Sequence, residues 1–159
     1  METMFWWMAL SVLLVDQLSK QWALTALRFD QSVPVIPGIF SLTLTPNTGI
    51  AFGMLSGKGW LTLPFTVVVV AGAVVYQFRG RPSRGISALT GLLVGGALGN
   101  FIDRLRFGFV VDMFDFVIWP VFNVADVAIT TSLLGLMAVQ LFARDEPSQT
   151  ESSPEEPRL

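Results

Sequence analysis

Four long apolar segments constrain the fold of this chain more than any other feature. They cover about residues 3–27, 60–78, 85–102 and 121–143. Each is close to the ~20 residues that a helix needs to cross the hydrocarbon core of a bilayer. The composition agrees, because 52% of the residues are hydrophobic and only 14% are charged, which is unusual for a soluble domain. We therefore predict an all-α membrane protein, with four transmembrane helices in one membrane-embedded domain of residues 1–143.

The connection after the first predicted helix, about residues 28–59, is long enough to hold structure of its own. Its run from Ser41 to Thr45 alternates polar and apolar residues, which predicts a strand. We expect a small β-element at about residues 38–55, between the first and second helices. The connection at about residues 103–120 is instead apolar almost throughout, and we expect it to lie in the membrane interface.

The loop between the second and third predicted helices sets the orientation. It carries three arginines and no acidic residue: Arg79, Arg81 and Arg84. Short loops rich in Lys and Arg stay in the cytoplasm, so both termini should be cytoplasmic and the β-element extracytoplasmic. The first helix is not preceded by the basic region of a cleavable signal peptide, and we expect it to be retained. Residues 144–159, rich in Glu, Ser and Pro, are predicted to form a disordered acidic tail.

The residue types that are missing exclude several kinds of chemistry. The chain has no cysteine and no histidine, which excludes disulfides, thiol nucleophiles, Ser-His triads and the usual zinc sites. We expect neither a metal nor another cofactor. The net charge of −2 gives no indication of a nucleic-acid partner. Any reaction must therefore use carboxyl, amino, guanidinium, hydroxyl or backbone groups.

Polar side chains gather at one level of the predicted helix bundle. At a rise of ~1.5 Å per residue, those of the first, third and fourth helices fall in the extracytoplasmic half of the membrane. They are Asp16, Lys20, Asn100, Asp103, Arg104, Asn123 and Asp126 on or beside the helices, and Asp112 on the second outer connection. Residues three or four apart share a helix face, so these side chains should point inward together. An ionisable residue in a span is disfavoured by at least ~2.5 kcal/mol and marks function by default.

Some of these residues also have structural interpretations. Asp16 and Lys20 could form a structural ion pair near the membrane surface, and Asp103 could pair with the neighbouring Arg104. Asp126 has no basic neighbour in sequence, so a structural role is harder to find for it. Small residues at a spacing of four favour close helix packing over chemistry. Three glycines have that spacing: Gly91, Gly95 and Gly99.

Two carboxyl groups brought together at this level could hydrolyse an amide. If Asp112 and Asp126 face each other, their repulsion makes them share one proton. The ionised acid can take a proton from an attacking water, while the protonated acid polarises the carbonyl and protonates the leaving amine. Asn100 and Asn123 could fix the carboxylates or bind the substrate backbone. The pairing stays open, because five aspartates besides Asp30 lie on that side of the membrane midplane: Asp16, Asp103, Asp112, Asp115 and Asp126.

Three other functions are compatible with parts of this pattern. A proton-coupled transporter or channel subunit also uses intramembrane acids, but it should carry polar groups toward both membrane faces, and the inner helix halves here lack charges. A Ser-Lys peptidase would need Ser19 and Lys20 to meet, yet adjacent helical residues diverge by about 100°. A purely structural membrane subunit would not need so many aligned Asn and Asp residues.

Five short sequence blocks follow one another along the chain: DQLSK from Asp16 to Lys20, NTGIAF from Asn47 to Phe52, GGALGNFIDR from Gly95 to Arg104, VVD from Val110 to Asp112 and FNVAD from Phe122 to Asp126. Taken in this order on a chain of this length, they resemble the bacterial lipoprotein signal peptidases (signal peptidase II). Each block alone is weak, but the five together are specific. The resemblance covers roughly residues 5–143 and leaves out the tail.

This resemblance implies an aspartic endopeptidase of the bacterial cytoplasmic (inner) membrane. Such an enzyme removes the signal peptide of diacylglyceryl-modified prolipoproteins just before the lipidated cysteine. The family's catalytic pair maps onto Asp112 and Asp126. Its other motif residues map onto Asp16, Lys20, Asn47, Gly49, Asn100, Asp103, Arg104, Asn123 and Ala125.

The same resemblance implies what the chain should bind. Its partners would be prolipoprotein substrates and membrane lipid, without nucleic acid, and the chain would act as a monomer. The first outer connection would be the family's extracytoplasmic β-cradle. The cyclic peptide antibiotic globomycin would be expected to occupy the site, which would lie near the extracytoplasmic face.

Overall fold

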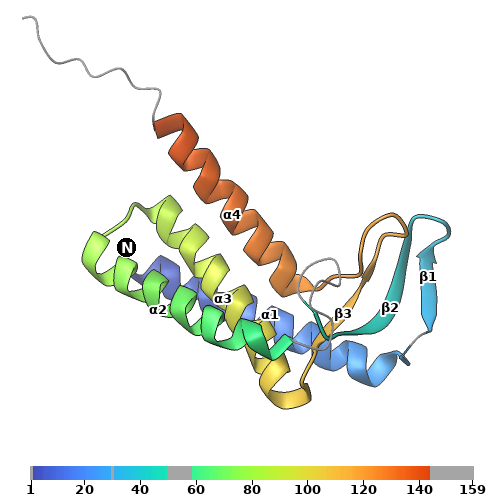
Figure 1. Cartoon of the computed structure of the whole chain (residues 1–159). Helices are drawn as coiled ribbons and strands as arrows, with labels where there is room; N and C mark the ends of the chain where they lie inside the picture. Colours follow the sequence, from blue (N-terminus) through green and yellow to red (C-terminus); the bar gives the residue numbers. More distant parts are fainter. Residues whose placement is uncertain (1, 30, 50–58, 144–159) are drawn as a thin grey trace, which may run out of the picture.

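The structure is a computed structural model that describes residues 2–29, 31–49 and 59–143 (Figure 1). It is mostly helical, with a three-stranded sheet at one end of the helices. The elements in chain order are α1 (Glu2–Ala26), β1 (Ser32–Ile36), β2 (Phe40–Asn47), the short 3-10 helix η2 (Gly59–Leu61), α2 (Thr62–Gly80), α3 (Arg84–Phe107), β3 (Val110–Asp115) and α4 (Val124–Ala143). The predicted acidic tail, residues 144–159, lies outside the described residues.

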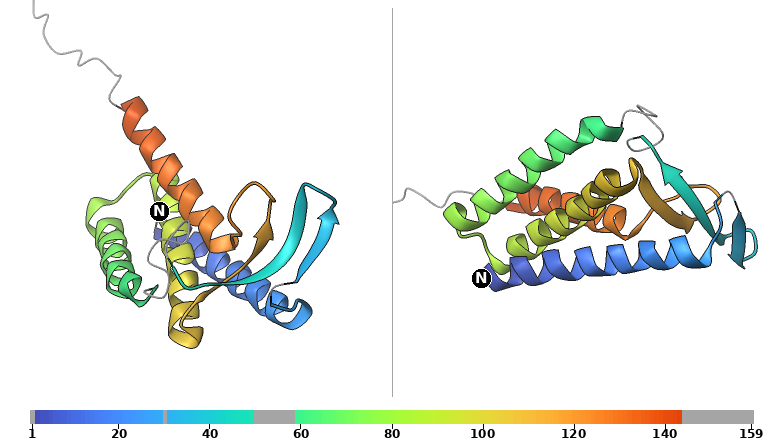
Figure 2. Two further views of the ribbon diagram at one scale, coloured as in Figure 1. Left: turned by 45° about the vertical axis from the view of Figure 1, so that its right-hand side comes forward. Right: turned by 90° about the horizontal axis from the view of Figure 1, so that it is seen from below.

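Helix α3 is the centre of the bundle, with α1, α2 and α4 packed around it (Figure 2). Its glycines make the close approach possible. A Cβ atom on Gly95 would lie 2.5 Å from the carbonyl oxygen of Ala9 in α1, and one on Gly96 would lie 2.7 Å from that of Ala125 in α4. A Cβ on Gly91 would likewise lie 2.5 Å from the carbonyl oxygen of Phe5. A Cβ on Gly99 would collide with the Asp16 carboxylate of α1, so the prediction that Gly91, Gly95 and Gly99 serve close helix packing is confirmed.

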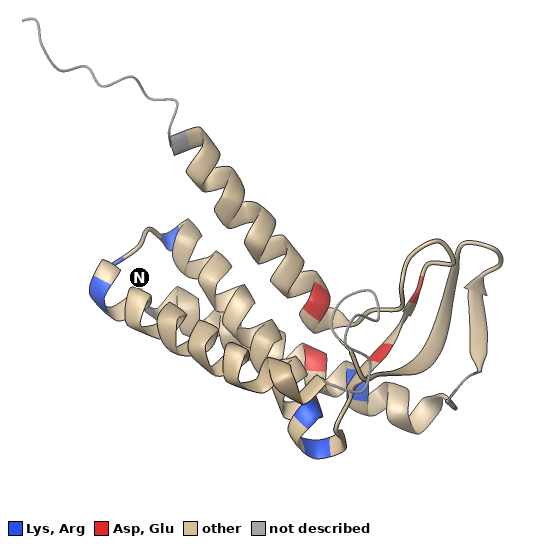
Figure 3. Ribbon diagram, viewed as in Figure 1, with Lys and Arg blue, Asp and Glu red and all other residues tan. Residues whose placement is uncertain are grey.

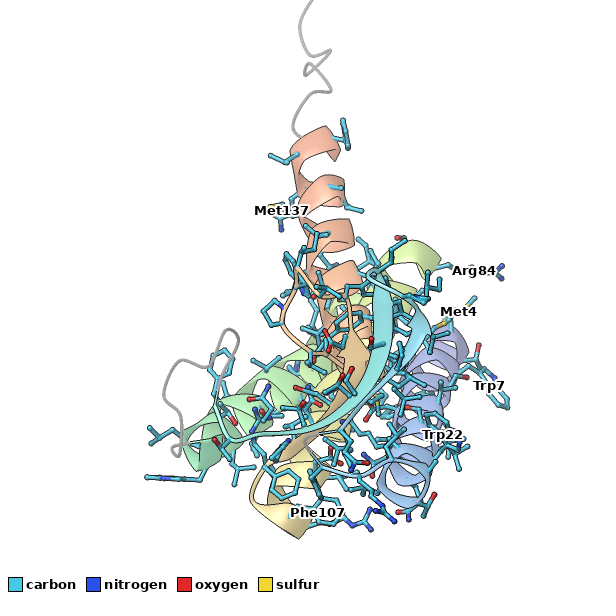
Figure 4. All side chains as sticks on the ribbon, turned by 90° about the vertical axis from the view of Figure 1, so that its right-hand side faces the viewer. Met4, Trp7, Trp22, Arg84, Phe107 and Met137 are labelled. Carbon is cyan, nitrogen blue, oxygen red and sulfur yellow. The ribbon has the colours of Figure 1, made fainter. Side chains whose placement is uncertain are left out.

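Among the described residues, three helical segments are long and apolar enough to cross a membrane: Gly59–Gly80, Arg84–Phe107 and Val124–Phe142. Helix α1 is 25 residues long but is not among them. Its last turns carry Asp16, Gln17 and Lys20, which lower its apolar character. The expected four spans are therefore supported for three helices by length and composition. On the side of α1 that faces away from the other helices, the side chains of Trp7 and Trp22 project outward (Figure 4).

The sheet has the antiparallel order β1-β2-β3. The predicted strand around Ser41–Thr45 is confirmed as β2, but the β-element begins earlier than expected, at Ser32. The strand β1 contains Pro34, which is tolerated because β1 lies at the edge of the sheet. The expected residues 50–55 of this element lie outside the described part of the chain.

The second outer connection, for which no strand was predicted, contains β3. Val110–Asp115 forms this strand, which pairs with β2 so that Thr45 opposes Asp112. Its first four residues are buried on both faces of the sheet. The strand therefore lacks the alternation of polar and apolar residues that a half-exposed strand shows. Met113 packs with Leu44 of β2 and Ala23 of α1, so the sheet rests on the last turns of α1.

Two helix boundaries also differ from those predicted, and both matter for the polar residues. Helix α3 continues to Phe107, where Gly108 at φ 79° ends it and donates its N–H to the Arg104 oxygen at 3.0 Å. Asp103 and Arg104 are thus within the helix rather than beyond its end. Helix α4 begins at Val124, so Asn123 precedes its first turn.

Adding a methyl group to Gly95 should weaken the α1–α3 interface. We expect Gly95→Ala to cost about 1–3 kcal/mol of stability, because its Cβ would overlap the backbone of Ala9. Gly85→Ala in the same helix is the matched control, since a Cβ there has nothing within 4 Å. Thermal unfolding in detergent compares the two. Equal melting temperatures for both variants would contradict the packing role of Gly95.

Candidate active site

Acidic and basic residues of α1, α3 and α4 lie near the sheet (Figure 3), and Lys20 forms ion pairs there with Asp16 and Asp103. Six polar residues there are buried: Asp16, Lys20, Asn100, Asp103, Asp112 and Asn123. Asp126 is partly buried beside them. Residues more than 100 positions apart in sequence thus share one hydrogen-bonded cluster, as the contact between Asp16 and the backbone of Ala125 illustrates.

Lys20 is at the base of this cluster. Its ammonium nitrogen lies 2.8 Å from Asp16 Oδ2, 3.0 Å from Asp103 Oδ2 and 2.8 Å from Asn100 Oδ1. The expected pair of Asp16 and Lys20 is therefore formed. The expected pair of Asp103 and Arg104 was wrong, because Asp103 turns to Lys20 instead. Neighbouring helical residues point about 100° apart, so Asp103 and Arg104 face different partners.

Each acid of this ion-pair network also holds a backbone group of another element. Asp16 Oδ1 accepts the N–H of Ala125 in α4 at 2.9 Å. Asp103 Oδ2 accepts the N–H of Val111 in β3 at 3.1 Å. The network therefore connects α1 and α3 to both segments that carry the other two acids.

Asp112 and Asp126 lie around one asparagine. Asn123 Nδ2 donates to Asp112 Oδ1 at 2.6 Å, and the Asn123 backbone N–H donates to Asp126 Oδ2 at 3.3 Å. Asp112 Oδ2 accepts a second amide, from Asn47 Nδ2 at 3.0 Å. Asp126 Oδ1 accepts Asn100 Nδ2 at 2.9 Å. Each carboxylate thus receives two N–H groups, and Asn123 contacts both acids.

The start of α4 explains why Asp126 is at this position. The Asp126 backbone N–H donates to Asn123 Oδ1 at 2.9 Å, while Asp126 Oδ2 accepts the Asn123 backbone N–H. This reciprocal pair, three residues apart, is a capping box that satisfies the first turn of the helix. The positive end of the helix dipole also favours a carboxylate there. Asp126 therefore has a local structural role besides any chemical one, which the sequence had not suggested.

Burial and charge act strongly on Asp112, whose side chain is 1% exposed. Desolvation by burial, and then the negative charge of Asp126, raise the pKa of Asp112 to about 7. The amides of Asn47 and Asn123 and the charge of Lys20 oppose this shift. A carboxyl group with a pKa near 7 can exist in both protonation states at neutral pH, as a general acid or base must.

Asn47, Gly49 and Arg104 form the rim of the cluster. Asn47 Oδ1 accepts a hydrogen bond from the N–H of Gly49 at 3.0 Å. The Gly49 backbone oxygen accepts one from Arg104 Nη2 at 3.1 Å. The Arg104 guanidinium interacts electrostatically with Asp126 and Asp112, yet its Nε has no hydrogen-bond partner among the described residues. The structure thus brings all the predicted site residues into one cluster.

Gln17 belongs to the same cluster but was not among the predicted site residues. Its Nε2 donates to Asp103 Oδ1 at 3.0 Å and to the Gly99 oxygen at 3.2 Å. Its i,i+3 spacing to Lys20 was the signal that could have found it. Ser19 instead donates to the Asp16 backbone oxygen of its own helix at 2.8 Å, so it has no contact with the Lys20 ammonium that a Ser-Lys peptidase needs. No group of three potential metal-ligating side chains occurs within residues 2–29, 31–49 and 59–143.

Comparisons with known proteins identify the family of this chain. A family model described as signal peptidase (SPase) II matches residues 8–142. The lipoprotein signal peptidase of Halothermothrix orenii is 47% identical over 117 residues, which cover 74% of this chain and 81% of that protein. The lipoprotein signal peptidase of Pelotomaculum thermopropionicum is 45% identical over 141 residues, which cover 88% of this chain and 93% of that protein.

Two solved structures have the same fold, and both are described as bacterial membrane enzymes determined by the in meso method. The first superposes with a TM-score of 0.85 at 30% identity, covering 92% of this chain and 92% of the other. The second has a TM-score of 0.76 at 32% identity and covers 84% of this chain and 90% of the other. The likeness therefore extends over most of this chain.

Removing the charge of Asp126 should change the titration of its neighbour. We expect Asp126→Asn to lower the pKa of Asp112 below about 7, because one cause of the shift is lost. The value should stay above 3.8, since burial, the larger cause, remains. Carbon-13 NMR of labelled aspartate carboxyls would measure the midpoint, with Asp115→Asn on the same strand as control. An unchanged midpoint in Asp126→Asn would show that the two acids are not coupled.

Proposed function

Since this chain belongs to the signal peptidase II family, we propose that it is an aspartic endopeptidase that cleaves diacylglyceryl-modified prolipoproteins immediately before the lipidated cysteine. The observation that carries the proposal is the placement of Asp112 and Asp126 on either side of Asn123. Their carboxyl groups are electrostatically coupled, and one of them has a pKa near 7. This is what hydrolysis of an amide by two acids requires.

In the proposed reaction, Asp126 is ionised and Asp112 holds the proton. Asp126 takes a proton from a water molecule, whose oxygen attacks the scissile carbonyl carbon. Asp112 donates its proton to the carbonyl oxygen, which gives a neutral tetrahedral diol. The C–N bond then breaks, the leaving nitrogen takes the proton from Asp126, and one diol hydroxyl returns a proton to Asp112. Both acids end the cycle in their starting states.

The surrounding amides suit these roles. Asn47 and Asn123 hold Asp112 from two sides, and Asn100 holds Asp126, so neither carboxyl group is free to rotate. The Nε of Arg104 has no hydrogen-bond partner in the described part of the chain, and it is a donor that could bind a backbone carbonyl of the substrate. Globomycin, a cyclic peptide, would occupy the same site.

The exposed apolar end of the sheet fits a substrate anchored in lipid. Ile118, on the connection between β3 and α4, is 96% exposed. It helps to line a groove of about 530 Å³ with Gly38, Ile39, Phe116, Val117, Trp119 and Phe122. Apolar and aromatic residues of this kind are at home in the membrane interface. A diacylated cysteine keeps its acyl chains in the bilayer, so its scissile bond would reach the acids at that depth.

We propose four membrane spans, with α1 as the fourth, in the bacterial cytoplasmic (inner) membrane. Large apolar side chains of α1 are exposed on its outer side, as lipid contact requires, including Trp7, Leu14 and Leu18. Arginines between α2 and α3 favour a cytoplasmic side for that loop and for both termini. The acids then lie near the extracytoplasmic face. We expect the enzyme to act as a monomer on prolipoproteins within membrane lipid.

Neutralising either proposed catalytic acid should stop cleavage. Asp112→Asn and Asp126→Asn should each lower kcat by a factor of about 10²–10⁴ or more, because proton transfer is lost while the side-chain shape is kept. Asp115→Asn is the matched control, since Asp115 is on β3 but bonds to Thr43 instead of the cluster. Purified variants that accumulate in the membrane are assayed on a diacylglyceryl-modified prolipoprotein. Normal turnover by either cluster variant would reject the two-acid mechanism.

The acyl chains of the substrate should be required for efficient cleavage. We expect purified enzyme in detergent to cleave a lipidated prolipoprotein and to leave its unlipidated form largely intact, with mass spectrometry locating the cut before the modified cysteine. The reaction should continue in excess chelator, because carboxyl groups alone carry the chemistry. Equal cleavage of the two substrates would contradict the lipid-anchored binding mode, and a requirement for added divalent ions would contradict the mechanism.

A further inference from the structure

The contacts of Lys20 determine more than charge balance. Its ammonium group has three N–H donors, and three acceptor groups surround it. The side chain is 2% exposed. Asp16 and Asp103 take two of these donors. The third goes to a neutral group, the Asn100 side-chain oxygen, at 2.8 Å. An ammonium group cannot accept a hydrogen bond, so Asn100 must present its oxygen, not its nitrogen, to Lys20.

This choice sets the direction of every following hydrogen bond. With its oxygen on Lys20, Asn100 turns its nitrogen to Asp126 Oδ1 at 2.9 Å. The same Asn100 oxygen accepts Asn123 Nδ2 at 3.2 Å, so the Asn123 nitrogen also faces Asp112. The remaining Asn123 oxygen then accepts the N–H of Asp126 at 2.9 Å. A reversed Asn100 amide would place a nitrogen against the ammonium and an oxygen against a carboxylate.

We propose that Lys20 is a positioning residue, which orients the amides of Asn100 and Asn123 and thereby the carboxyl groups of Asp112 and Asp126. The inference rests on the proposed function of these two acids. Lys20 itself contacts neither of them in the hydrogen-bond network. Its geometric effect on the two carboxyl groups passes through the Asn100 amide, while its charge also acts on Asp112 without a hydrogen bond. The geometric effect is separable from the ion pairs of Lys20 with Asp16 and Asp103.

The test compares Lys20→Met, Asn100→Leu and the double variant, with kcat expressed per folded enzyme. Lys20→Met should lower kcat by about tenfold or more and change KM by less than about threefold, because amide alignment serves the chemical step. In the Asn100→Leu background, the same Lys20 change should lower kcat by less than about threefold, since the amide that it orients is already gone. Additive losses would overturn the proposal.

The pH profile gives a second readout, which a merely structural role would not move. The charged groups acting on Asp112 are Asp126, Lys20 and Arg104, from α4, α1 and α3. The Asn123 amide and the charge of Lys20 both lower the pKa of Asp112, and the amide is the larger of these two causes. Loss of Lys20, and with it the orientation of that amide, should therefore raise this pKa further. Because Asp112 must be protonated, the alkaline limb of kcat/KM in Lys20→Met should move to higher pH. An unmoved limb would count against the proposal.

Gln17→Met is the matched control for damage to the network. Gln17 donates to Asp103, to the Gly99 oxygen and, at 3.4 Å, to Asp16 Oδ2, but it does not bond to Asn100. Its replacement should lower the melting temperature and leave the alkaline limb in place. A limb that moves in Gln17→Met as it does in Lys20→Met would show that general loosening, not amide orientation, causes the change, and would overturn the proposal.

Lys20→Met leaves two buried acids without a counterion, so a neutral background is also tested. Asp16→Asn/Lys20→Met/Asp103→Asn is compared with Asp16→Asn/Asp103→Asn, and the loss of kcat should persist in the triple variant. Failure of the triple variant to fold would assign Lys20 to packing and overturn the proposal. Cleavage by Asp112→Asn would refute the proposed function, whereas additive losses in an enzyme that needs Asp112 would refute only the role of Lys20.

Discussion

A single buried ammonium group organises the polar half of this molecule. Lys20 places its three N–H groups on Asp16, Asp103 and Asn100, and the two carboxylates then hold the backbone of α4 and of β3. Burying such charges is costly, and the cost is offset only when every donor and acceptor is satisfied. The three N–H donors of Lys20 all have acceptors here, so the cost of burying this charge is offset. The same bonds determine how the ends of α1, α3, β3 and α4 lie relative to one another.

Close helix packing makes this ammonium site possible. In a membrane, helices gain little from apolar burial against each other, so small residues that allow close approach become important. A Cβ on Gly99 would collide with the carboxylate of Asp16, and one on Gly96 would crowd Ala125. Because Gly96 and Gly99 of α3 have no side chains, Asp16 has room to reach α4. The stability of the bundle and the geometry of the acids depend on the same helix face.

The site itself combines two ordinary structural devices with one costly feature. A capping box starts α4 and places Asp126, and an antiparallel strand pair brings Asn47 alongside Asp112. The costly feature is a buried carboxyl group beside a second one, which raises the pKa of Asp112 to about 7. Energetically costly features are usually found where function requires them. Membership of the signal peptidase II family gives that function a chemical class, cleavage of a peptide bond at the membrane.

The sequence by itself determined the apolar helices, the strand β2, the glycine packing and the kind of chemistry available, because these follow from local periodicity and residue type. It also predicted that the acids lie at one level of the helix bundle, since the helical rise per residue is constant. Only the tertiary structure decided that residues 110–115 form a strand, that Asp103 pairs with Lys20 and that Gln17 joins the cluster. Each of these depends on partners distant in the chain. Burial on both faces hid the strand's alternation, and helix direction, not sequence adjacency, selected the ion pairs.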